Sequence, residues 1–231
     1  MIDTKFNMYS DANGGDPDST SRTLRRYHQA LWSKPLPSGA VFELQEKRGY
    51  YLFHSSELGE FSMGSDAITH SYKHQQRKKW LTEQIPADVQ EVFDAGSTIG
   101  GYLLFPKNMV NKKQTINQLR GTLRLIDDRF DLTLECIKRF YLGESSPLRE
   151  VLLRYDTFFR LFETFDGYVN FFLLNDLVAE DGTIKFYLPF DDFQTPPTFK
   201  GVDDYLTYKR HVLAFVECRN RRIEDSPLSK I

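Results

Sequence analysis

The spacing of apolar residues divides the chain into a first half with mixed patterns and a second half with helical ones. Residues 1–18, rich in Asp, Asn and Gly, predict an extended lead-in. Apolar side chains then recur at helical spacing from Leu24 to Leu31, behind a run of capping residues, which predicts a helix over 19–34. Two apolar runs on either side of a turn predict a β-hairpin over 41–53.

The remaining elements follow from the same patterns. Ser65 or Asp66 is placed to cap a polar helix that continues to about Gln84, and Gly96 follows a second, shorter helix. After residue 112 helical spacing dominates, interrupted by one apolar run with strand character at 183–190. The other predicted elements are a strand over 98–106, helices over 126–142 and 146–167, a third apolar helix after Gly167, and a long last helix over 202–223.

Together these elements predict an α+β fold with a small, mostly antiparallel sheet packed on an aromatic-rich helical core. We expect the strand at 183–190 to join that sheet. A length of 231 residues suits a single globular domain over 1–231, in which 19–106 mix strands and helices and 107–231 are mainly helical. The 19 Phe and 12 Tyr supply the core, since each buried ring removes roughly 150–250 Å² from water.

Composition argues against several classes of protein. The 40% hydrophobic and 27% charged residues are typical of a soluble globular chain. No window reaches the roughly 18 consecutive apolar residues that a membrane helix needs, and the N-terminus lacks a basic region followed by an apolar stretch. We therefore expect a cytoplasmic protein without a membrane partner. Cys136 and Cys218 have no neighbouring Cys or paired His, so we expect reduced thiols and no cofactor.

Several blocks of the sequence are familiar in combination. They are DPDSTSRTLRRYHQALWSKPLPSG, GEFSMGSDAITHSY, TIGGYLLFP, INQLRG, DRFDLTLECIKRFY, DGYVNFFLLNDLV and FYLPFDDF. Together these blocks resemble an uncharacterised bacterial protein family whose members have about this length. The resemblance covers nearly the whole chain and implies a bacterial origin and a single domain. Because that family has no assigned activity, the resemblance transfers no catalytic residue.

Charge is distributed unevenly, although the net charge is only −2. Two runs, 22–34 and 70–80, contain basic residues and no acid. Cations contact phosphate groups, and aromatic side chains stack on bases. The leading hypothesis is therefore that the chain binds RNA or a phosphate-bearing nucleotide through these two basic segments. The candidate ligand-binding residues are Arg22, Arg25, Arg26, Lys73, Arg77, Lys78, Lys79 and Trp80, with His28 beside the first segment.

Arg22 and His28 raise an enzymatic alternative. Their separation is similar to the Arg-to-His spacing of HEPN-type ribonucleases, in which the His assists attack by the 2′-hydroxyl and the Arg steadies the phosphate. Metal-independent RNA cleavage needs such a base and cation near the scissile phosphate. A toxin-like ribonuclease that uses these two residues is therefore an alternative, although Thr23 follows Arg22 where that motif usually has Asn, Asp or His.

Two other groups of residues could carry chemistry. If 66–84 is helical, Asp66, His70 and His74 share one face and could hold a divalent metal, although the surrounding positive charge opposes a cation. His54, at the end of a predicted strand, faintly resembles the catalytic-strand His of ADP-ribosyltransferases. In each case a polar surface or a strand-edge His is the simpler interpretation.

The acidic second half raises an alternative of a different class. Residues 156–204 contain ten acids and three bases. Such a segment could dock a protein partner, so an interaction or inhibitor module remains open. The sequence does not distinguish an enzyme from a binding protein, and it does not indicate an oligomeric state.

Overall fold

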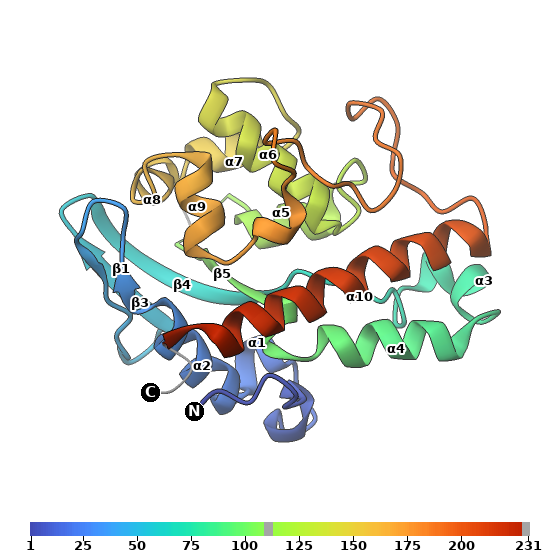
Figure 1. Cartoon of the computed structure of the whole chain (residues 1–231), viewed down its shortest axis with the longest axis horizontal. Helices are drawn as coiled ribbons and strands as arrows, with labels where there is room; N and C mark the ends of the chain where they lie inside the picture. Colours follow the sequence, from blue (N-terminus) through green and yellow to red (C-terminus); the bar gives the residue numbers. More distant parts are fainter. Residues whose placement is uncertain (109–112, 228–231) are drawn as a thin grey trace.

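A three-stranded antiparallel sheet lies at the centre of the computed structural model, which describes residues 1–108 and 113–227 (Figure 1). Its strands are β3 (Leu52–Ser56), β4 (Gly59–Ala67) and β5 (Tyr102–Pro106), in the order β3-β4-β5. A second, two-stranded antiparallel sheet consists of β1 (Lys34–Pro35) and β2 (Val41–Phe42). The two sheets confirm the small antiparallel sheet structure predicted from the sequence.

The register of the sheet leaves part of its central strand open on one side. β3 pairs with β4 from Gly59 to Met63, whereas β5 pairs with β4 from Met63 to Ala67. The last residues of β4 therefore have no β3 partner. The short helix α1 (Pro17–Thr20) packs against β4, and Asp18 of this helix bonds Ser65 there. This contact brings the N-terminal segment to the sheet.

The first long helix, α2 (Arg22–Trp32), follows α1 directly and forms as the apolar spacing predicts. Ser21 caps it by accepting a hydrogen bond from the backbone N–H of Leu24. Leu24 and Leu31 are buried on its inner face, while Arg22 is exposed on the outer one. The predicted lead-in is partly regular, because η1 (Met8–Asp11) and the start of α1 lie within it.

Helices of the second half cover one face of the sheet (Figure 1). They are α5 (Ile116–Thr122), α6 (Phe130–Leu142), α7 (Arg149–Leu153), α8 (Asp156–Arg160) and α9 (Phe165–Phe171), followed by η4 (Asn175–Leu177). The last helix, α10 (Val202–Asp225), packs along α4 (Pro86–Gly96). None of the helices in the described residues is both long and apolar enough to cross a bilayer.

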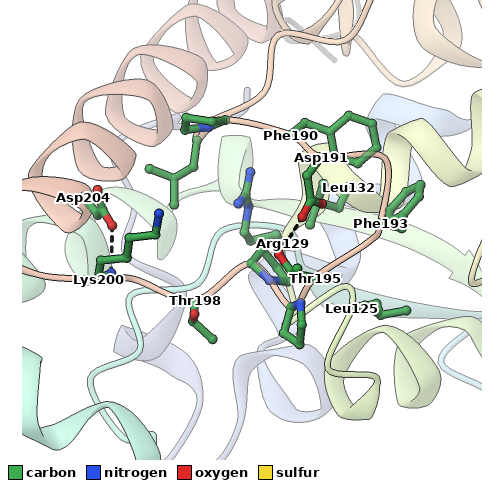
Figure 2. Close-up of a pocket in the computed structure, with 14 residues that line it drawn as sticks. Leu125, Arg129, Leu132, Phe190, Asp191, Phe193, Thr195, Thr198, Lys200 and Asp204 are labelled. Atoms are coloured by element: carbon green, nitrogen blue, oxygen red, sulfur yellow. Dashed lines mark hydrogen bonds between the residues drawn. The ribbon is translucent and has the colours of Figure 1, made fainter.

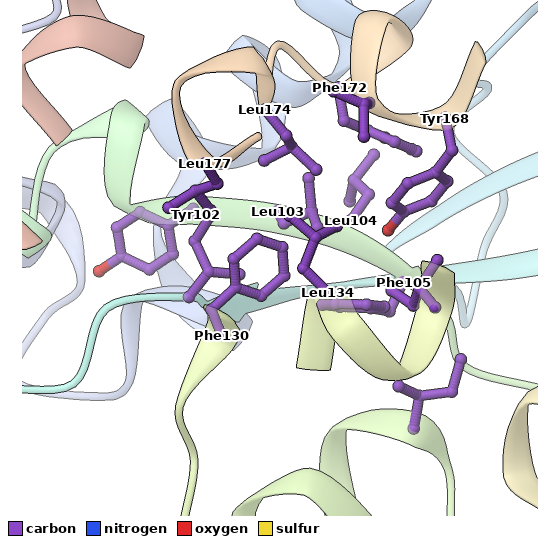
Figure 3. Close-up of a cluster of buried hydrophobic side chains, with 14 of the residues drawn as sticks. Tyr102, Leu103, Leu104, Phe105, Phe130, Leu134, Tyr168, Phe172, Leu174 and Leu177 are labelled. Carbon is purple, nitrogen blue, oxygen red and sulfur yellow. The ribbon is translucent and has the colours of Figure 1, made fainter. Parts of the chain in front are cut away.

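The core lies between β5 and the helices that cover it (Figure 3). Leu103, Leu104 and Phe105 of β5 are fully buried, and Phe130 of α6 and Phe172 beside α9 join the same cluster. Further aromatic rings extend this cluster toward the first half of the chain. Their ring contacts include Trp32–Phe172, Phe42–Phe171 and Phe158–Phe162. The predicted aromatic-rich helical core is confirmed.

The predicted helix over 66–84 is wrong. Asp66 lies in β4, opposite Leu103 of β5, so its backbone belongs to the sheet. Only η2 (Gln76–Lys78) and α3 (Lys79–Thr82) are helical in the rest of this range. The polar run has no continuous apolar face that could stabilise a long helix by packing, whereas the neighbouring strand offers a complete ladder.

Four other predicted elements differ from the observed ones. Residues 183–190 form no strand, and their only sheet-like contact is an isolated bridge between Ile184 and Val178. The hairpin over 41–53 is reduced to one bridge between Gln45 and Phe53, because β3 pairs mainly with β4. The helix over 146–167 is split into α7 and α8, and the strand over 98–106 begins as η3 (Ile99–Gly101).

Candidate basic ligand-binding site

Two adjoining cavities lie beside the exposed face of α2. The larger, with a volume of about 600 Å³, opens between α1 and the loop before β3, and we call it the basic pocket. The smaller, of about 450 Å³, lies along α2, and we call it the flanking pocket. Both are lined by Arg25 and Glu46. The basic pocket is also lined by Asp18, Ser19, Lys47, Arg48, Gly49, Tyr50, Tyr51 and Lys107, and the flanking pocket by Arg22, Thr23, Arg26 and Gln29.

The cations around these pockets have no acidic partner. Among the described residues, none of their side chains makes a hydrogen bond or an ion pair with a protein group; they are Arg22, Arg25, Arg26, Lys47, Arg48 and Lys107. Arg25 instead lies 4.9 Å from the centre of the Tyr51 ring. The stem of Lys107 lies over Gly64, where a side chain would collide with it. Six positive charges therefore face two acids, Asp18 and Glu46, along one surface.

A chain of hydrogen bonds runs from the core to the wall of the basic pocket. Trp32 donates its indole N–H to Nδ1 of His28 at 3.0 Å, so the neutral imidazole carries its proton on Nε2. That Nε2–H lies 3.0 Å from Oγ of Ser65, to which it donates. The Ser65 hydroxyl in turn donates to Oδ1 of Asp18 at 2.9 Å. The core thus sets the direction of each hydrogen bond up to the Asp18 carboxylate.

Burial sets the protonation of the two titratable groups in this chain, His28 and Asp18. His28 is fully buried, which lowers its pKa to about 3, with a smaller contribution from the charge of Arg219. Burial also raises the pKa of Asp18 to about 6, with Asp16 adding to the effect. His28 is therefore neutral near pH 7, while Asp18 titrates close to neutrality.

The structure gives no support to the pairing of Arg22 with His28. The guanidinium side chain is exposed on the outer face of α2, whereas the imidazole is fully buried on the inner face. Nδ1 of His28 already accepts the Trp32 proton and Nε2 donates to Ser65, so neither nitrogen is free to act as a base. The two residues are not brought together as a catalytic pair.

The second basic segment lies at the opposite end of the molecule from α2, next to α3 (Figure 1). Arg77 and Lys78 both pair with Asp127, the latter at 2.9 Å, and the Lys78 side chain is buried. Lys73 donates to the side chain of Gln90 at 2.7 Å. Lys79 and Trp80 are exposed. The two basic segments do not form one site, and most of the second segment's charges already have a protein partner.

The predicted metal face does not form, because Asp66 belongs to a strand and not to a helix. Its carboxylate pairs with Arg120, which also binds Asp128 at 3.1 Å. His70 lies 3.7 Å from Asp128, and the His74 ring packs edge-on against Phe93. No group of three or more potential metal ligands occurs within 1–108 and 113–227. Asp66, His70 and His74 therefore do not share the helical face on which they were metal candidates.

His54 lies in the core and not at an active-site edge. Its side chain is 1% exposed and lies between the rings of Phe42 and Phe61. Nδ1 lies 2.9 Å from the carbonyl oxygen of Glu43, to which it donates. Burial lowers the pKa of this imidazole. A ring enclosed in this way has no contact with a ligand cavity.

A separate cavity of about 460 Å³ lies between the start of α6 and the segment 188–200 (Figure 2). Arg129 is 1% exposed there, and its guanidinium binds both carboxylate oxygens of Asp131. The backbone N–H of Lys200 donates to Asp204 at 2.7 Å. The apolar part of the wall comes from Leu125, Leu132, Leu188, Phe190 and Phe193. Because Asp131 neutralises the buried cation, this cavity offers a phosphate group far less positive charge than the basic pocket does.

The sequence matches a protein family described as a family of unknown function, DUF6994, over residues 2–223. The chain belongs to this family. Neither a curated protein nor a solved structure matches it. Membership of DUF6994 confirms the whole-chain resemblance found in the sequence blocks, and it assigns no activity.

Several residues of this DUF6994 site were not identified from the sequence. Lys47 and Arg48 lie in the turn of the hairpin predicted over 41–53, and Lys107 follows a strand far along the chain. Asp18 belongs to the run of capping residues before the helix predicted over 19–34, which indicates a structural role. The run Glu-Lys-Arg-Gly-Tyr-Tyr, with two cations and two aromatic rings in a turn, was the one local signal that could have indicated them.

Proposed function

We propose that this protein binds a phosphate-bearing ligand, a nucleotide or RNA, in the basic pocket and along the flanking pocket. The observation that carries the proposal is the group of six cations that face these cavities without an acidic partner among the described residues. Burying or neutralising cations within the protein usually involves acids, as Asp127 does for Arg77 and Lys78. Cations that remain unpaired on one surface favour an anionic ligand.

The proposal moves the ligand site relative to the sequence hypothesis. It retains Arg22, Arg25 and Arg26, and it adds three cations outside α2, which are Lys47, Arg48 and Lys107. It does not depend on the second basic segment. The exposed ring of Tyr50 in the same pocket supplies a face on which a base can stack. We retain the bacterial, cytoplasmic setting expected from the sequence as part of this proposal.

The two other functional classes have less support. A ribonuclease based on Arg22 and His28 lacks an available base in this geometry. Two acids of the segment 156–204 already pair with basic residues of the same chain, since Asp176 binds Arg222 and Asp192 binds Arg139. We therefore do not favour either an Arg22–His28 nuclease or a docking module built on this segment.

Binding of a fluorescein-labelled oligouridylate, followed by fluorescence anisotropy at about 50 mM salt, tests the proposal. The variant Arg22→Ala/Arg26→Ala removes two exposed cations that have no protein partner. We expect its affinity to fall at least about tenfold and the slope of log K against log salt to decrease by about 1.4, two contacts at roughly 0.7 each.

The matched control is Lys79→Ala/Arg124→Ala, which removes two exposed cations elsewhere and changes the net charge equally. We expect this control to bind the oligonucleotide as the wild type does. Equal losses in both variants would indicate a general charge effect and would count against the site. Absence of binding by the wild-type protein to the oligonucleotide, to AMP and to inorganic phosphate would refute the proposed function.

A further inference from the structure

Asp18 is the unusual group in the basic pocket, because it is a carboxylate in a wall made mostly of cations. It is half-buried, and no basic side chain of the described residues lies within ion-pair distance of it. Its partners are the Ser65 hydroxyl at 2.9 Å and the nearby backbone N–H of Ala67, and Asp16 is a like charge that acts on it. A group that only balanced the cations would form an ion pair with one of them.

We propose that the basic pocket takes a ribonucleoside phosphate, with the ribose hydroxyls donating to the Asp18 carboxylate and the phosphate bound by the surrounding cations. This inference rests on the proposed function and names its ligand class. A carboxylate repels a bare phosphate, but it accepts hydrogen bonds from a vicinal diol. Acidic residues are used in this way to bind the ribose hydroxyls of dinucleotides. The pocket volume of about 600 Å³ lies within the range of small-molecule sites.

The hydrogen-bond chain behind Asp18 supports a positioning role for the buried residues. Because Trp32 occupies Nδ1 of His28, the imidazole must donate to Ser65, and the Ser65 proton must then point at Asp18. One carboxylate oxygen is thereby held from the protein side. The group is fixed in place by the core, and a carboxylate oxygen can accept further hydrogen bonds from a ligand.

The other components of a nucleotide have matching groups in the same cavity. Arg25, Arg48 and Lys107 can bind the phosphate, and the exposed Tyr50 ring can stack on the base. Tyr51 closes the pocket wall, with Arg25 over its ring. An RNA chain would offer the carboxylate only a 2′-hydroxyl at internal positions, whereas a free ribonucleotide offers the 2′,3′-diol.

Isothermal titration with three probes, AMP, 2′,3′-dideoxy-AMP and inorganic phosphate, tests this assignment. We expect the wild-type protein to bind AMP at least about tenfold more tightly than dideoxy-AMP, because the analogue leaves the carboxylate without donors. The variant Asp18→Asn keeps an oxygen that accepts the Ser65 proton but carries no charge. It is expected to lose the preference for AMP while binding inorganic phosphate as tightly as the wild type or more tightly.

The opposite directions of these two effects separate ribose recognition from a purely structural role. Equal affinities of the wild type for AMP and dideoxy-AMP would overturn the inference, and so would a uniform loss for all three probes in a folded Asp18→Asn variant. If the variant does not fold, the wild-type comparison of AMP with its dideoxy analogue decides alone. Binding of the oligouridylate without binding of AMP would refute this inference and leave the proposed function standing.

Discussion

The buried imidazole of His28 makes stability depend on pH in a way that one substitution can isolate. The pKa of His28 is lowered from 6.5 to about 3 in the folded protein, chiefly by burial. Because the folded-state pKa is below the unfolded one, the unfolded chain binds more protons as the pH falls, and stability decreases with it. The loss begins near pH 6.5 and continues toward pH 3.

The size of the effect follows from the two pKa values. At pH 5 the folded imidazole is still neutral, whereas the unfolded one is mostly protonated. Because pH 5 lies about 1.5 units below the unfolded-state pKa of 6.5, the free energy of unfolding is lower at pH 5 by about 2 kcal/mol, at roughly 1.4 kcal/mol per unit. His28→Gln removes this titration and costs about 1–3 kcal/mol at pH 8, because the new amide cannot match both hydrogen bonds.

Equilibrium unfolding in urea at pH 8 and pH 5 measures the effect as a difference of differences. Asp18 changes stability in the opposite direction, because its pKa is raised, but it is present in both proteins and cancels. The wild type should therefore exceed His28→Gln in free energy of unfolding by about 2 kcal/mol less at pH 5 than at pH 8. His74→Gln, the same substitution at an exposed position, is the control.

A constant difference between wild type and His28→Gln across this pH range would refute the reasoning. It would mean that His28 takes up its proton in the folded state as readily as in the unfolded one. The donor order from Trp32 through Ser65 to Asp18 would then be wrong as well.

Three further predictions rest on other parts of the structure. Arg219→Met should lower the free energy of unfolding, measured in urea, by about 3–5 kcal/mol. The fully buried guanidinium is bound to three backbone carbonyls, which would lose their donor. A decrease of less than about 1 kcal/mol would contradict this prediction. Gly101→Ala should prevent folding to the native state, as judged by circular dichroism and thermal melting, because the added Cβ would lie 2.0 Å from the carbonyl oxygen of Gly96. In titrations, the preference of the wild type for AMP over dideoxy-AMP should weaken as the pH falls through about 6, because protonated Asp18 is a weaker hydrogen-bond acceptor. A preference that persists at pH 4.5 would contradict ribose binding by the Asp18 carboxylate.

The elements that could be predicted from the sequence are those whose signals are local. The caps and apolar face of α2, the apolar stripe of α6 ending at Gly143, and the long helix α10 depend on neighbouring residues. The sequence of 57–69 indicates only a loop or a possible strand, because the last residues of β4 pair with β5, which lies more than 30 residues further along the chain. Its polar side chains, Ser65 and Asp66, were therefore interpreted as a helix start.

Only part of the candidate site could be predicted from the sequence, because only part of it depends on neighbouring residues. The cations of α2 are visible in the sequence, but whether a cation is paired depends on acids far along the chain. Asp127 neutralises Arg77 and Lys78 across about 50 residues, and nothing local indicates it. Likewise Lys107 reaches the basic pocket only through the pairing of β5 with β4. Both basic segments are visible in the sequence, but local residues do not show which segment has its charges paired.

The most direct test of the central claim is to observe the arginine side chains while a ligand is added. In a two-dimensional NMR titration of the ¹⁵N-labelled protein with AMP at about 50 mM salt, the Nε–Hε signals of Arg25 and Arg48 should shift together and saturate. The signal of Arg77, which is held by Asp127, should stay in place. Shifts at Arg77 without shifts at Arg25 and Arg48, or no shift at any of them, would contradict the account.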